Sequence, residues 1–92
     1  MATRPIAFQV TATDQMAYWI AVDEHDVTLV NGKGTVALEQ GVEHVLVWWM
    51  IGNPGDALSI TGADGTRQVV NIKESKIPPN TNKGAGYRRF KV

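Results

Sequence analysis

Residues 45–51 read VLVWWMI, seven apolar side chains in succession. The run is followed by the turn sequence GNPGD at residues 52–56, where proline presets φ and glycine accepts a positive φ. An apolar run of this length, bounded by a turn, is typical of a strand. We therefore predict a strand over residues 43–51. Successive side chains of a strand point to opposite faces, so one tryptophan of the pair enters a core and its neighbour points away from it.

The rest of the chain shows alternating apolar and polar residues and no helical period. Turn signals such as Asn31-Gly32 separate the segments. We predict strands over residues 5–13, 16–22, 27–30, 35–39, 43–51, 57–61, 66–73 and 87–92. The polar residues 23–26 are expected to form a loop, and residues 75–86 a long loop. Short strands with frequent turns predict one all-β domain, residues 1–92, folded as an immunoglobulin-like antiparallel β-sandwich, with a small barrel as the alternative.

The two faces of the predicted strand 43–51 differ in composition. One face is entirely β-branched or aromatic, which suits packing on a pleated surface; its members are Val45, Val47, Trp49 and Ile51. The other face carries His44, Leu46, Trp48 and Met50. We therefore predict that Trp49 packs in the core and that Trp48 points outward beside Met50. The same alternation in strand 16–22 places Ile20 in the core and leaves Trp19 outward.

The outward residues Trp19, Trp48 and Met50 form the candidate interaction surface. It has three interpretations: loops such as 75–86 cover it or the facing is opposite, another protein or subunit covers it, or the rings stack on a sugar. Aromatic residues and methionine are enriched at protein interfaces. We expect protein–protein contact or self-association as a homo-oligomer, with carbohydrate binding as the alternative. The next turn offers polar neighbours for a sugar site, Asn53 and Asp56.

Residues 38–47, LEQGVEHVLV, followed by Gly52, resemble the strand–glycine–strand hairpin of carboxypeptidase-regulatory-like and PEGA-type domains. Those domains are immunoglobulin- or prealbumin-like sandwiches, in which a glycine precedes a strand of alternating apolar residues. Here more residues separate the glycine from the strand than in the usual pattern. The resemblance covers about a sixth of the chain. It implies a binding or structural module rather than an enzyme, and it assigns no functional residue.

The charges of the chain balance to zero but are unevenly distributed. Residues 1–66 have a net charge of −6, and residues 67–92 have a net charge of +6. The split indicates either a basic segment that meets an anion or basic C-terminal strands that lie beside acidic ones. Residues 83–91 interleave basic and aromatic side chains, as single-strand binders do. Overall neutrality opposes binding to a polyanion, so a nucleic-acid partner is not expected.

Few residues are suited to catalysis or metal binding. The chain has no cysteine and two histidines, His25 and His44. The cluster 23–26, Asp-Glu-His-Asp, matches no metal-ligand spacing and is interpreted as a solvated turn. His44 is interpreted as a polar residue at a strand end. We predict a non-enzymatic protein with no catalytic residue, metal or cofactor. No apolar run is long enough for a membrane span, and the N-terminus has no signal-peptide pattern, so a cytoplasmic location is the default expectation.

Overall fold

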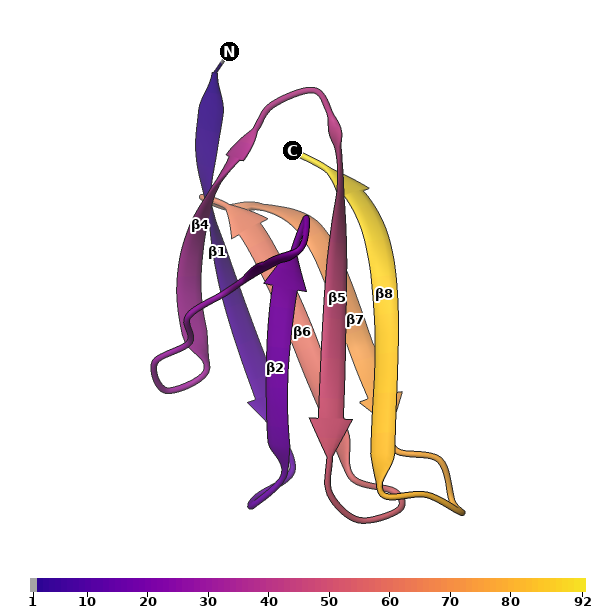
Figure 1. Ribbon diagram of the computed structural model, residues 1–92. Helices are drawn as coiled ribbons and strands as arrows, with labels where there is room; N and C mark the ends of the chain where they lie inside the picture. The colour runs from indigo at the N-terminus through magenta and orange to yellow at the C-terminus, as the bar shows by residue number, and fades with distance from the viewer. Residues whose placement is uncertain (1) are drawn as a thin grey trace.

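Two four-stranded antiparallel sheets pack face to face in the computed structural model, which describes residues 2–92 (Figure 1). The strands are β1 (Thr3–Ala12), β2 (Ala17–Val22), β3 (His25–Asp26), β4 (Lys33–Glu39), β5 (Glu43–Ile51), β6 (Ala57–Asp64), β7 (Arg67–Lys76) and β8 (Lys83–Lys91). The strand orders are β4-β1-β6-β7 and β3-β2-β5-β8. The predicted all-β sandwich is confirmed. No helix in this part of the chain is long and apolar enough to cross a membrane.

Turn chemistry sets where the chain reverses near β3 and β4. Asn31 and Gly32 have φ of 54° and 77°, and the Val30 amide donates to the Lys33 carbonyl at 2.8 Å. The predicted Asn31-Gly32 turn is therefore confirmed. Asp23 and Glu24 also have positive φ, 50° and 70°, and they form a second two-residue reversal. The predicted loop at 23–26 is therefore correct for Asp23 and Glu24, but His25–Asp26 form β3. The prediction of a strand at 27–30 is wrong.

The connection between β7 and β8 is shorter than expected. The prediction of a loop over residues 75–86 is wrong in its extent, because β7 continues to Lys76 and β8 begins at Lys83. Ile77 is fully buried at the start of the connection. Its amide donates to the Asp56 carbonyl at 2.8 Å, and its carbonyl accepts from the Gly55 amide at 3.0 Å. This anchor ties the connection to the β5–β6 turn.

The core reverses the predicted facing of β5. Trp48 is 5% exposed and Met50 is buried, whereas Trp49 turns outward and is half-buried. The reason lies in β8, where Gly86 is the register partner of Trp48 and Gly84 that of Met50. A Cβ on Gly84 would come within 2.6 Å of the Met50 Cε, and one on Gly86 would overlap the Trp48 indole. The prediction that Trp49 enters the core and that Trp48 and Met50 point outward is therefore wrong.

The buried Trp48 also joins the two sheets through a hydrogen bond. Its Nε1 donates to the Ser75 Oγ of β7 at 2.9 Å, which satisfies the one polar atom of the indole. Fully buried side chains of the same core cluster come from both sheets and from the β7–β8 connection: Ile6, Phe8, Ile20, Leu46, Leu58, Ile60 and Ile77. Trp48 is therefore a central element of the core.

Candidate functional site

The outer face of the β3-β2-β5-β8 sheet carries a pair of stacked tryptophans. Trp19 of β2 and Trp49 of β5 are register partners, and their ring centroids lie 6.0 Å apart with 20° between the ring planes. Trp19 is 42% exposed, as its predicted outward position requires. Trp49 stands on this face in place of Trp48. Of the predicted surface residues Trp19, Trp48 and Met50, Trp19 alone lies on this face, because Trp48 and Met50 are buried on the opposite one.

Further apolar side chains extend this face on either side of the tryptophan pair. Ile51 is 44% exposed and Tyr87 is 67% exposed. Along β2, Trp19 is flanked on the same face by Ala17 and Ala21, whose side chains are too small to cover an indole ring. We call Trp19, Trp49, Ile51 and Tyr87 the aromatic face. It is a contiguous stripe across three strands rather than a set of scattered apolar residues.

A hollow of about 470 Å³ opens beside the tryptophan pair. Its lining is formed by Trp19, Trp49, Met50, Ile51, Lys83, Gly84 and Ala85. Lys83 is the one charged residue in that lining. The predicted polar neighbours Asn53 and Asp56 are not part of it, because they close their own turn: the Asn53 amide donates to the Asp56 Oδ2 at 2.9 Å. The hollow therefore suits apolar contact better than recognition of hydroxyl groups.

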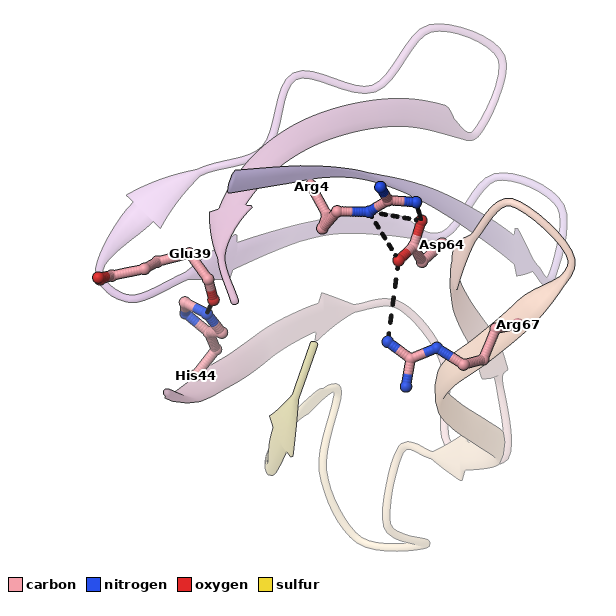
Figure 2. A network of polar contacts seen from close by, with 5 residues as sticks. All are labelled: Arg4, Glu39, His44, Asp64 and Arg67. Carbon is pink, nitrogen blue, oxygen red and sulfur yellow. Dashed lines mark hydrogen bonds and ion pairs between the residues drawn. The ribbon is translucent and has the colours of Figure 1, made fainter. Parts of the chain in front are cut away.

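A second site, which is polar, lies at the start of β5, where His44 is 4% exposed. Its Nδ1 lies 2.5 Å from the Asp23 Oδ2. Its Nε2 lies 2.8 Å from the backbone oxygen of Glu39, as Figure 2 shows. With Asp23 ionised, both ring nitrogens face acceptors, so the ring makes both bonds as the doubly protonated imidazolium. The other Asp23 oxygen accepts from the Val45 amide at 2.9 Å. His44 lies near one end of β5, as predicted, but it is buried there and clamps two turns together.

The contacts of this clamp shift the pKa of both partners. Burial lowers the pKa of His44, but its hydrogen bonds to Asp23 and to the Glu39 carbonyl raise that pKa overall. Burial raises the pKa of Asp23, but the bonds from His44 and from the Val45 amide lower it overall. Both shifts favour the charged pair. The pair fixes the β2–β3 turn against β5, and the ring is closed to molecules in solution.

A third site, which is the second polar cluster, joins the start of β1 to the β6–β7 hairpin (Figure 2). The Nη2 of Arg4 donates to the Asp64 Oδ1 at 2.9 Å, and its Nε donates to the Oδ2 at 3.1 Å. The Nη2 of Arg67 lies 3.8 Å from the same carboxylate. The pKa of Asp64 is lowered below its usual range, mainly because its carboxylate accepts hydrogen bonds from Arg4. Because both guanidinium groups are largely exposed, the cluster orders the hairpin and adds little stability.

Sequence reasoning missed both polar clusters because their members are far apart in the chain. Arg4 and Asp64 are separated by 60 residues, and His44 and Asp23 by 21. The polar run 23–26 is a visible signal, but nothing in its spacing indicates that Asp23 pairs with His44. Within residues 2–92, no group of three or more potential ligands among His, Cys, Asp and Glu converges on one point.

Comparisons of the chain with protein-family models, with curated proteins and with solved structures found no match. The resemblance to carboxypeptidase-regulatory-like and PEGA-type domains therefore stays a prediction. Function has to be argued from the surface itself.

Proposed function

We propose that this protein is a non-enzymatic binding module whose aromatic face contacts another protein, with a second copy of the chain as its first partner. The observation that carries the proposal is the stacked pair of exposed Trp19 and half-buried Trp49 on the face that also carries Ile51 and Tyr87. Contiguous apolar surface of this kind marks interaction sites on soluble proteins. Tryptophan and tyrosine also supply a large share of the binding energy at interfaces.

The polar groups around the face favour a protein partner over a sugar. A sugar site combines ring stacking with several hydrogen-bonding groups aimed at hydroxyls. The hollow beside the tryptophans has Lys83 as its one charged side chain, and the Asp56 carboxylate is used within its own turn. An apolar protein surface needs no such partners. Carbohydrate binding is the alternative function, and a glycan-binding measurement distinguishes it from protein contact.

The rim of the aromatic face is compatible with two-fold self-association. When two copies pair through the same face, they are related by a two-fold axis. A residue then contacts a different residue of the other copy, unless it lies on that axis. The rim carries both signs, since Glu43 lies 3.9 Å from Arg89 and opposite Lys91, and Asp26 lies at the other side of the sheet. When a second copy packs on this face, its rim therefore does not meet charges of a single sign. Packing of two such sheet faces would cover the tryptophan pairs of both copies.

Light scattering at micromolar concentration tests this proposal. The wild type is expected to run larger than its monomer mass of 10.1 kDa. Trp19→Glu should convert it to a monomer, because a charge buried without a partner in an apolar contact is costly. Thr35→Glu is the matched control: it makes the same charge change at an exposed position of the other sheet and should leave the assembly intact. An interface formed by apolar rings should also change little between low and high salt.

Two results would contradict self-association. The first is a wild type that stays monomeric at every concentration measured. The second is a Thr35→Glu variant that dissociates as completely as Trp19→Glu. If the monomer instead binds immobilised glycans saturably and loses that binding with Trp19→Ala, the face is a carbohydrate platform. A monomer that binds no glycan would leave another protein as the remaining partner class.

A further inference from the structure

Strand β8 leaves one long edge of its sheet open. It is nine residues long, and its register with β5 is continuous from Lys83 opposite Ile51 to Lys91 opposite Glu43. It is the last strand in the order β3-β2-β5-β8, so within residues 2–92 no strand pairs with its other side. Figure 1 shows β8 at the margin of the front sheet. An uncovered edge strand of this length is a template for pairing with another chain.

The free backbone groups of β8 can be assigned from the ladder. The Gly52 amide donates to the Asn82 carbonyl at 3.0 Å, which directs the even-numbered residues of this segment toward β5. The Lys83 amide points away and donates instead to the Thr81 Oγ1 at 3.2 Å. Neighbouring residues in an antiparallel ladder direct their N–H and C=O groups to opposite sides. The groups that face the open edge are therefore those of Ala85, Tyr87, Arg89 and Lys91.

This edge is basic. Its charged side chains are exposed and all positive: Lys83, Arg88, Arg89 and Lys91. Among residues 2–92, Arg89 alone of these has an acidic group within 4.0 Å, Glu43 at 3.9 Å. Arg88 and Arg89 also line a second hollow against β7, together with the amide side chains of Gln68 and Asn71. The edge thus offers unpaired backbone donors beside four cations, of which Lys83, Arg88 and Lys91 have no acidic group within 4.0 Å among the described residues.

The charge pattern argues against pairing of this edge with a second copy of the chain. Antiparallel pairing of two β8 strands centred on Tyr87 would put Lys83 opposite Lys91, and directly opposed like charges are destabilising. The acidic edge of another copy is no better, because β3 is two residues long and offers little ladder. The edges of the other sheet in a second copy are no more acidic, because β7 carries three cations and one acid and β4 carries one of each. No edge of a second copy therefore complements β8.

We propose that β8 binds an extended acidic segment of a different protein by strand addition. The segment would pair its backbone with Ala85, Tyr87, Arg89 and Lys91 and set its Asp and Glu side chains against the cations of β8. Backbone hydrogen bonds supply affinity in this mode, and alternate side chains supply specificity. This inference does not rest on the aromatic face: Tyr87 belongs to both, but strand addition uses its backbone N–H and C=O groups, whereas the aromatic face uses its ring.

The test uses the full chain and a synthetic peptide of the same length as β8, in which Glu alternates with Thr and Val. Amide NMR should show an alternating response. The amides of Ala85, Tyr87, Arg89 and Lys91 should shift and become protected from exchange, while those of Gly86 and Arg88 should change little because they already bond β5. A peptide with Lys in place of Glu should bind much more weakly.

Two variants separate the backbone and charge contributions. Tyr87→Pro removes one outward N–H at an edge position, where proline is tolerated, and should abolish binding. Replacement of Arg88, Arg89 and Lys91 by Gln should weaken binding about tenfold, as expected when three exposed ion pairs are lost. Its matched control replaces Lys33, Lys73 and Lys76 by Gln, which changes the net charge equally away from β8. If Tyr87→Pro fails to fold, the two Gln variants still decide.

Three results would overturn the proposal. One is the absence of saturable binding of the acidic peptide up to about 1 mM. Another is equal binding by the Lys peptide or by the two Gln variants. The third is a response confined to the indole N–H signals of Trp19 and Trp49, which would place the peptide on the aromatic face. Tighter binding of a single-stranded oligonucleotide than of the peptide would replace the acidic segment with a nucleic acid.

Discussion

Truncation of Trp48 should destabilise this domain far more than truncation of its neighbour. Trp48 is 5% exposed, lies over Gly86 and donates to Ser75 at 2.9 Å. Trp48→Ala should cost about 3–5 kcal/mol for the cavity and about 1 kcal/mol for the lost hydrogen bond. A chain of 92 residues has a total stability of about 5–14 kcal/mol. Trp49→Ala removes a half-buried ring and one stacking contact, so it should cost about 1–2 kcal/mol.

Urea unfolding followed by circular dichroism measures this difference, because the midpoint shifts in proportion to the lost free energy. If Trp48→Ala does not fold, Trp48→Phe keeps a ring in place but loses the bond to Ser75, and it should still cost about 1–3 kcal/mol. Trp49→Phe is the matched control and should cost less than about 1 kcal/mol. Equal midpoints for the two Phe variants, or a larger loss at Trp49, would refute the assignment of Trp48 to the core.

Two further predictions concern the polar clamp and the backbone turns. Because the pKa of His44 is raised and that of Asp23 is lowered, the stability from this pair should be largest between about pH 4 and 6.5. This stability should fall as pH rises through the raised pKa of His44 and as pH falls through the lowered pKa of Asp23. Measurement of the unfolding free energy against pH should show the alkaline decline in the wild type but not in His44→Ala. The same pH dependence in both proteins would contradict the clamp. Gly32 and Gly41 both have positive φ, but a Cβ on Gly32 would lie 2.5 Å from the Val10 carbonyl oxygen, whereas Gly41 has open space. Gly41→Ala should therefore cost about 1–2 kcal/mol and Gly32→Ala more, and equal thermal shifts would show that the Val10 contact does not matter.

The sequence carried enough information to predict the sandwich and several of its elements. The bounds of β5, residues 43–51, agree with the prediction because alternating side chains and two flanking turns define them on both sides. The Asn31-Gly32 turn was predictable because few other residue pairs accept positive φ at both positions. The start of β8 was not predictable by the same logic. Gly84 and Gly86 read locally as loop residues, and only their pairing with β5 makes them part of a strand.

The facing of β5 shows why the site was misplaced by one residue. A shift of one position exchanges the two faces of a strand, and the composition of β5 could not decide between them, because both faces are apolar. The deciding information lies in β8, where glycines leave room for the large side chains of Trp48 and Met50. Trp48 therefore lies on the inner face, where Gly86 leaves space for its ring. The outer face kept Trp49 and the β-branched residues that resemble a core, and water-exposed apolar area of this kind is unfavourable by about 25 cal/mol per Å². Strand pairing, and not the loops, places this apolar area in contact with water. Its exposure is the physical reason to expect a partner on the aromatic face.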